Sequence, residues 1–331
     1  MVLSYDISYV IGKRDDDRDS AIEDAASSTA SLTSSIQHYR QVNGRTYHAD
    51  CGDNIYWGPN DNLQNGMVDI MHHAYTLALG DKLYLAPLPE HIDKALDIGT
   101  GTGVWAIDFA DERPETQVIG TDISPIQPTW VPPNLEFQIE DMAQDWTFPS
   151  NAFDFVHIRW MIGSVVDWNA LFKKAYNVLK PGGWLESYEL DADIQCDDDS
   201  IPSRSAVADY GYIFREGGKK IGTEASFNPV GDRLQRKAFD ASGFVNIKET
   251  PIKMPMSEWP KDPKQREIGL YTRAVIFHDT EGIFNYMASK IEWSPENVSV
   301  YAAHLRRELK SLNVHCYYRS LVVIGQKPVA E

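Results

Sequence analysis

The stretch Ala95-Leu-Asp-Ile-Gly-Thr-Gly-Thr-Gly-Val-Trp105 decides the fold of this chain of 331 residues. Leu96 and Ile98 are typical of a short buried strand, the three glycines predict a tight turn, and residues 104–110 predict the start of a helix. Glycine is needed where a ligand approaches the backbone more closely than a Cβ allows, and a helix N-terminus presents free N–H groups. The stretch therefore predicts a ligand-binding turn between a strand and a helix.

The spacing of this turn separates it from the turn that binds dinucleotides. It reads Gly-x-Gly-x-Gly, and Val104 stands where the dinucleotide fingerprint has its last glycine. Asp97, just before the first glycine, suits a ligand with an ammonium group better than a pyrophosphate.

Four further strands are predicted after the turn, at residues 117–122, 135–139, 153–158 and 184–189. The first ends at Asp122, where a carboxylate can reach the ribose hydroxyls of a nucleoside. The second is followed by Asp141 and Met142, an acid and an apolar residue suited to an adenine amino group and ring face. Alternation of strands and helices from 95 to 190 predicts a doubly wound parallel sheet with ligands at its carboxyl edge.

Taken together, these motifs resemble the class I S-adenosyl-L-methionine-dependent methyltransferases, and more closely the fungal LaeA-like methyltransferases. The likeness is carried by residues 96–108, 119–134 and 179–184, and it extends over residues 40–328 through Tyr47-His48, His72-His73 and Val314-His-Cys-Tyr-Tyr318. Residues 265–293 depart from the family pattern, so the resemblance carries over no substrate.

The resemblance implies an α/β fold, a Rossmann-like doubly wound sheet of seven strands with an N-terminal helical cover and a C-terminal helical lid. We expect a flexible arm over 1–39, the cover over 40–90, the cofactor-binding core over 91–190, and the rest of the core with the lid over 191–331. S-adenosyl-L-methionine is the expected cofactor. Its expected binding residues are Asp97, Gly99, Thr100, Gly101, Gly103, Asp122, Ile123, Asp141, Met142 and Arg159.

Several of these side chains carry an alternative interpretation. The family match places Arg159 near the methionine carboxylate, whereas a surface or interdomain salt bridge is the other possibility. His157 is a candidate general base or a packed core residue, and His73 a candidate pocket or core residue. Tyr188 is a third catalytic candidate, as one of the aromatics that could sandwich a planar substrate, although such aromatics are more often core.

Composition narrows the range of partners. A net charge of −17 argues against nucleic acid as a substrate, since phosphate binding needs a basic face. The three cysteines are unclustered, which fits a reducing cytoplasmic or nuclear compartment and no metal site. Most of the acids from 191 to 199 are interpreted as part of a solvated loop, and we expect no membrane span and no signal peptide.

Outside the core, residues 62–85 predict a covering helix, and 204–220, 230–242 and 299–312 predict further helices. Residues 244–248 and 318–326 predict the last two strands. Residues 24–36 are a flexible segment or a helix that swaps onto a partner in a homodimer.

Three functions remain compatible with the sequence. The first is methyl transfer to a small molecule of fungal secondary metabolism, in a cavity closed by residues 40–90 and 255–315. The second is a LaeA-like nuclear regulator that acts in a protein complex. The third is a pericyclase-like enzyme that binds the cofactor without methyl transfer.

Overall fold

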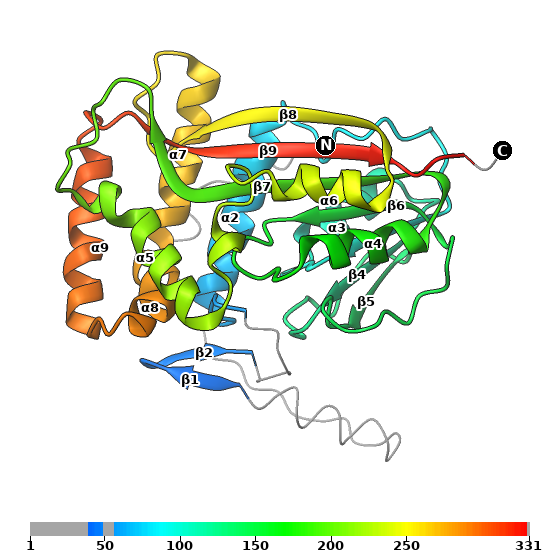
Figure 1. Ribbon diagram of the computed structural model, residues 1–331, viewed down its shortest axis with the longest axis horizontal. Coiled ribbons are helices and arrows are strands. Elements are labelled where there is room, and N and C mark those ends of the chain that lie inside the picture. Colours follow the sequence, from blue (N-terminus) through cyan, green and yellow to red (C-terminus); the bar gives the residue numbers. More distant parts are fainter. Residues whose placement is uncertain (1–38, 49–55, 330–331) are drawn as a thin grey trace. The chain divides into compact units, whose positions relative to one another are not determined.

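The computed structural model describes residues 39–48 and 56–329, all within one compact unit (Figure 1). The predicted arm over 1–39, apart from its last residue, and the predicted swapped helix at 24–36 lie outside the described residues. In the described part, no helix combines the length and the apolar character that a membrane crossing requires.

A seven-stranded sheet organises the chain, as predicted. Its order is β5-β4-β3-β6-β7-β9-β8, and β9 runs antiparallel to the other six strands. The strands are β3 (Lys94–Ile98), β4 (Gln117–Asp122), β5 (Leu135–Ile139), β6 (Phe153–Arg159), β7 (Leu179–Cys196), β8 (Val245–Pro255) and β9 (Cys316–Gln326). The chain winds outward from β3 to β5 and returns to β6, so the order reverses between β3 and β6. Ligands bind at such a switch point, at the carboxyl ends of the strands.

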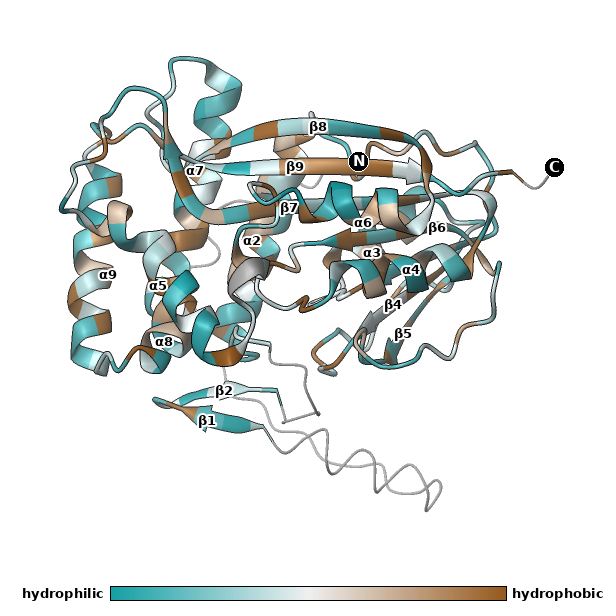
Figure 2. Ribbon diagram, in the orientation of Figure 1, coloured by the Kyte–Doolittle hydropathy of each residue, from teal (hydrophilic) through white to brown (hydrophobic). Residues whose placement is uncertain are grey.

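Hydrophobic alternation along β7 divides the core into two layers. Tyr188 and Leu190 face the layer that includes α2 (Asn62–Ala78) and α3 (Val104–Glu112). Leu185 faces the other layer, with α4 (Trp168–Val178) and α6 (Leu234–Ser242). Successive side chains of a strand point to opposite faces, so one buried strand can supply both layers. The middle of β9 is likewise hydrophobic (Figure 2).

Four more helices lie beyond the sheet: α5 (Ala206–Ile221), α7 (Pro263–His278), α8 (Thr280–Lys290) and α9 (Pro295–Lys310). α5, α8 and α9 pack together at one end of β7 and β9 (Figure 1). Each of the four is preceded by a Ser or Asp whose side chain accepts an N–H of the first turn. Of the apolar side predicted for the helix over 299–312, Tyr301, Leu305 and Leu309 are buried in α9, whereas Leu312 lies beyond its end and is exposed.

A short hairpin of β1 (Arg40–Val42) and β2 (Arg45–Tyr47) is joined to the helices by Arg45. Its guanidinium donates to Asp61 at 2.5 and 2.7 Å and to Asp279 at 2.9 and 2.7 Å. These two acids are the N-caps of α2 and α8. One partly exposed cation therefore ties together the starts of two helices that lie far apart in the sequence.

Some predicted boundaries were wrong for local reasons. α2 ends at Ala78 rather than near residue 85, because Gly80 and Asp81 adopt left-handed backbone conformations. Asp197, Asp198 and Asp199 are exposed after the end of β7 at Cys196, as predicted for most of the acids from 191 to 199, whereas Asp191 on β7 is fully buried. Its carboxylate accepts the N–H groups of Val230 and Gly231, so α6 begins at 234 rather than 230.

Glu186 on β7 holds the segment that follows the covering helix. Its Oε2 accepts the N–H groups of Leu85 and Ala86, both at 2.7 Å, while Oε1 is buried without a partner among the described residues. Burial raises the pKa of Glu186 from 4.5 to about 7. The folded protein therefore holds this proton more tightly than the unfolded chain. Its contribution to stability is fully present below pH 4.5 and is lost as the pH rises through 7.

We therefore expect Glu186→Gln, which cannot ionise, to gain stability relative to the wild type between pH 5 and pH 8, by up to ~3 kcal/mol. The glutamine oxygen can still accept both N–H groups. Urea unfolding at the two pH values measures this, with the exposed Glu90→Gln as control. An equal pH dependence of Glu186→Gln and the wild type would contradict the assignment.

Candidate functional site

A cavity lies at the carboxyl ends of β3, β4 and β6, where the strand order reverses. It encloses about 1080 Å³, counting its open mouth. The glycine turn forms its floor, the start of α2 covers it, and residues 140 and 142 close one side. Of the predicted cofactor residues, it is lined by Asp97, Gly99, Thr100, Gly101, Asp122, Ile123, Met142 and Arg159. Gly103 and Asp141 are not among its lining residues.

Left-handed backbone conformations at the glycines shape the turn. Gly99, Gly101 and Gly103 have φ angles of 68°, 60° and 82°. A Cβ on Gly103 would lie 2.3 Å from the Phe137 ring, whereas a Cβ on Gly101 would meet nothing closer than 3.8 Å. Gly103 is thus required by packing, and Gly101 borders free space in the cavity.

Asp97 is buried at the end of β3 and joins the turn to the neighbouring strand. Its Oδ2 accepts the Thr100 hydroxyl at 2.6 Å, and its Oδ1 lies 2.7 Å from Nδ1 of His157 on β6. Burial lowers the pKa of His157, so its neutral ring donates Nδ1–H to Asp97. The ring also stacks on Trp105, with centroids 3.7 Å apart. His157 is therefore both a packed residue and a wall of the cavity.

Asp122 ends β4 with its carboxylate in the cavity. Its Oδ2 accepts the N–H of Gly101 at 2.8 Å and its Oδ1 accepts the N–H of Ser124 at 2.9 Å. Burial raises the pKa of Asp122 to about 6, so the group is ionised at neutral pH. The two N–H groups orient a negative charge at the position where the sequence predicts ribose hydroxyls.

Arg159 presents a positive charge to the same cavity. Its Nη2 donates to Nδ1 of His72 at 2.9 Å, and Nε2–H of His72 donates to Asp108 at 2.9 Å. Burial lowers the pKa of His72, which keeps the ring neutral. Arg159 forms no ion pair with a carboxylate of the described residues, so the predicted alternative of a salt bridge is not observed among them. A guanidinium held by a neutral partner is suited to an anionic ligand group.

Polar side chains that the sequence analysis missed complete the cavity. Asn60, Gln64 and Asn65 at the start of α2, and Ser164 after β6, line it. Each has a buried polar atom without a hydrogen-bond partner among the described residues. Buried polar atoms are costly when unpaired, so these groups indicate a polar ligand. Only the position of Asn60 beside the helix cap Asp61 could have drawn attention to them.

The other catalytic candidates lie elsewhere. His73 packs edge-on against Tyr271 of α7, with centroids 4.3 Å apart. Tyr188 is fully buried against Tyr75, and its hydroxyl lies 3.6 Å from the sulfur of Met254. Neither residue lines the cavity. His73 lies between the helices α2 and α7, and Tyr188 lies between the sheet and α2. The periodicity of a single segment does not distinguish such packing from a ligand-binding wall.

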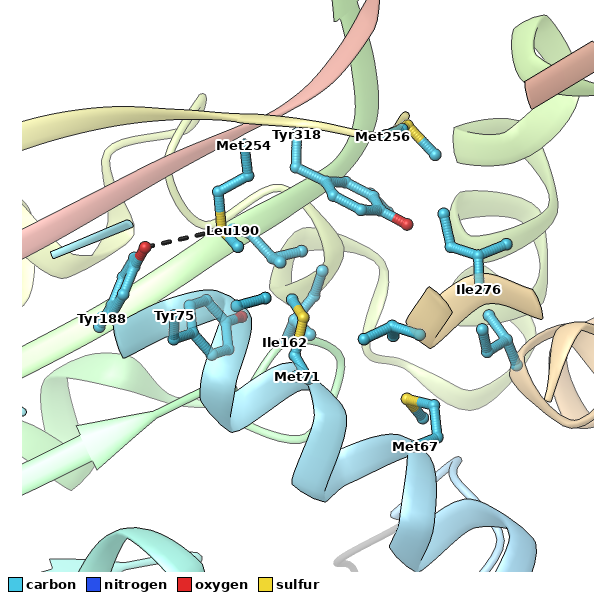
Figure 3. Packing of buried hydrophobic residues seen from close by; sticks show 14 of the residues in the cluster. Met67, Met71, Tyr75, Ile162, Tyr188, Leu190, Met254, Met256, Ile276 and Tyr318 are labelled. Carbon is cyan, nitrogen blue, oxygen red and sulfur yellow. Dashed lines mark hydrogen bonds between the residues drawn. The ribbon is translucent and has the colours of Figure 1, made fainter. Parts of the chain in front are cut away.

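A second, apolar cavity shares Trp160 with the first and encloses about 470 Å³, counting its mouth. Trp57, Met67 and Met71 line it from the cover, and Val275 and Ile283 from the lid. Figure 3 shows Met67 and Met71 on α2 directed toward Ile162, Leu190 and Tyr318. Both segments predicted to close over a substrate therefore contribute walls. The described residues contain no group of three His, Cys, Asp or Glu arranged to hold a metal ion.

Comparison with known proteins relates the chain to methyltransferases. Residues 71–248 match the model of a methyltransferase domain. The chain is 36% identical to methyltransferase pytC of Aspergillus terreus, over 94% of this chain and 95% of that protein. It is 33% identical to the secondary metabolism regulator LAE1 of Cochliobolus heterostrophus, over 86% of this chain and 94% of that protein. The structure of a phosphoethanolamine N-methyltransferase from Haemonchus contortus aligns with a TM-score of 0.45 and 18% identity, over 80% of this chain and 52% of that chain.

The glycine turn yields a test with an internal control. Gly103→Ala and Gly80→Ala both place a Cβ on a left-handed residue, which costs roughly 1–2 kcal/mol. An added Cβ on Gly80 meets nothing within 4 Å, whereas on Gly103 it displaces the Phe137 ring. We expect Gly103→Ala to lose about 1–3 kcal/mol more than Gly80→Ala in urea unfolding. Equal losses would show that Phe137 moves aside freely.

Proposed function

This chain belongs to the LaeA-like S-adenosylmethionine-dependent methyltransferases, and we propose that it methylates a small molecule of fungal secondary metabolism. S-adenosylmethionine is the cofactor, and it supplies an electrophilic methyl group. The observation that carries the choice of a small acceptor is the apolar cavity beside the polar one. A small apolar cavity of this kind suits a small ligand better than a protein surface.

The charges of the first cavity fit the charged ends of the cofactor. We assign the methionine carboxylate to Arg159, which has no carboxylate partner of its own among the described residues. The methionine ammonium group is assigned to Asp97 at the end of β3. A ligand with both charges matches this pair better than a pyrophosphate, which would face the Asp97 carboxylate.

The nucleoside end is assigned to the neighbouring strands. Asp122 accepts the ribose hydroxyls, since its carboxylate is already oriented by two N–H groups. Gly99, Thr100, Gly101 and Ile123 form the adjoining floor, and Gly103 allows the turn to pack on Phe137. Asp141 and Met142, after β5, remain the candidates for the adenine amino group and ring face.

The methyl acceptor must lose a proton when its nucleophilic atom is methylated, and we propose His157 as the base that takes this proton. It lines the cavity, and burial keeps its ring neutral. Asp97 orients the ring through Nδ1, which fixes the tautomer whose Nε2 lone pair accepts a proton. His73 and Tyr188 are less suited to this role, because they pack away from the cavity.

A regulator that works in a protein complex would instead expose a contiguous apolar face. The exposed large apolar residues of the described chain belong to different helices, strands and loops, with Trp130 the most exposed. This distribution favours the small-molecule function. The free thiols of Cys196 and Cys316 fit a reducing compartment, and we propose a cytoplasmic or nuclear location.

Asp122→Ala tests the cofactor site. Loss of the carboxylate should weaken binding of S-adenosylmethionine by about 1.5–3 kcal/mol for each hydrogen bond lost to the ribose, because these bonds are charge-assisted. Isothermal titration calorimetry measures the affinity, with the exposed Asp111→Ala on α3 as control. An unchanged affinity in folded Asp122→Ala would refute the assignment.

Methyl transfer itself is tested with cofactor labelled in the methyl group. Incubation of the protein with a small-molecule extract of a fungal culture should move the label to a product of low molecular mass. Asp122→Ala should lower the yield at a limiting cofactor concentration. Label on protein alone would favour the regulatory function, and label that stays on the cofactor would count against methyl transfer.

A further inference from the structure

The second cavity has walls of an unusually uniform character. They come from the cover, the segment after β6, β7, β9 and the helices α5, α7 and α8, and no charged residue is among them. The lining residues are Trp57, Met67, Met71, Trp160, Ile162, Leu190, Ala192, Tyr210, Phe214, Val275, Ile283 and Tyr318. A charged group would lose its hydration here without finding a counter-charge, so the occupant is uncharged over the part that enters.

Hydrogen-bonding groups are few in this wall. The indole N–H of Trp57 already donates to the carbonyl oxygen of Ile162 at 2.7 Å. The hydroxyls of Tyr210 and Tyr318 bond to each other at 2.7 Å, and both side chains are buried. Burial raises the pKa of both phenols, so both keep their protons.

A pair of hydroxyls has two hydrogens and needs only one for the bond between them. One hydroxyl of the Tyr210–Tyr318 pair therefore keeps an O–H hydrogen that bonds to neither tyrosine. Buried donors are rarely left unpaired in proteins, because the lost hydrogen bond is costly. The spare hydrogen calls for an oxygen acceptor in the cavity.

Trp160 sets the position of this cavity beside the first one, because its side chain lines both. Its φ angle of 56° is left-handed, which is rare for a bulky residue and is held here by its N–H bond to the carbonyl of Tyr188. A molecule in the second cavity thus has one end at Trp160, next to the proposed cofactor site. Met67 and Met71 give the wall side chains that adapt to the shape of a ligand.

We propose that the second cavity holds the apolar ring of the methyl acceptor, and that the Tyr210–Tyr318 pair donates a hydrogen bond to an uncharged oxygen on that ring. The acceptor class is thus an uncharged cyclic compound with a carbonyl or ether oxygen remote from the methylated end. This inference rests on the proposed function, since it takes the first cavity as the cofactor site.

Two probes of nearly the same shape test the hydrogen bond. Acetophenone has a carbonyl oxygen where α-methylstyrene has a methylene carbon. Their affinities are measured by saturation-transfer NMR in the presence of S-adenosylhomocysteine, for the wild type and for the double variant Tyr210→Phe/Tyr318→Phe. Tyr317→Phe is the control, because Tyr317 lies on the opposite face of β9 and donates to Asp197.

We expect the double variant to bind acetophenone about fivefold more weakly, the equivalent of ~1 kcal/mol for a neutral hydrogen bond. Its affinity for α-methylstyrene should stay within twofold of the wild type, and Tyr317→Phe should change neither. The hydrocarbon reports any effect of the two substitutions on the cavity other than the loss of the hydrogen bond. An equal change for both probes, or no change for either, would overturn the role of the tyrosine pair.

A second variant tests the location without touching the tyrosines. Ala192→Leu adds three carbons to the wall of the second cavity. It should abolish binding of both probes and leave binding of S-adenosylhomocysteine intact. If the wild type binds S-adenosylhomocysteine but neither probe, this inference fails alone. If S-adenosylhomocysteine does not bind to the folded wild type, the proposed function fails with it.

Discussion

The buried carboxylate of Asp97 is the constraint on which the rest of this structure depends. A carboxylate in the protein interior requires hydrogen-bond donors, and here they come from Thr100 in the glycine turn and His157 on the next strand. Asp97 thereby holds the glycine turn against β3 and β6, the two strands between which the strand order reverses. The floor of the first cavity, the orientation of Asp122 through Gly101, and the position of α3 all follow from that arrangement.

Charged side chains also attach the helical cover and lid to this frame. Arg45 joins the caps of α2 and α8, and Arg159 reaches His72 and, through it, Asp108 on α3. These contacts link elements that are distant in the sequence, and they place the start of α2 over the cavity. The same arrangement keeps Arg159 without a carboxylate partner among the described residues. The hydrogen bonds that hold Arg159 in place therefore leave its positive charge available to a ligand in the first cavity.

The two cavities divide the chemistry between them. Unpaired amides, hydroxyls and opposite charges line the first, which suits a polar cofactor with charged ends. Aromatic and aliphatic side chains line the second, with one pair of tyrosine hydroxyls. Trp160 lines both cavities and has a left-handed backbone conformation. In the proposed function, the cofactor and the acceptor would lie on either side of this residue.

From the sequence we predicted the strands of the core, the glycine turn and the acids at the strand ends, because these depend on local periodicity and on the backbone freedom of glycine. The motifs also indicated the family, and most of the residues proposed for the cofactor lie together at one edge of the sheet. The tertiary structure alone decided that Tyr188 and His73 pack away from the cavity, that Asn60 and Ser164 border it, and that Tyr210 meets Tyr318. These outcomes depend on which faces of distant segments come together. When a side chain packs against a residue far along the chain, neither segment carries a periodic pattern that shows the contact.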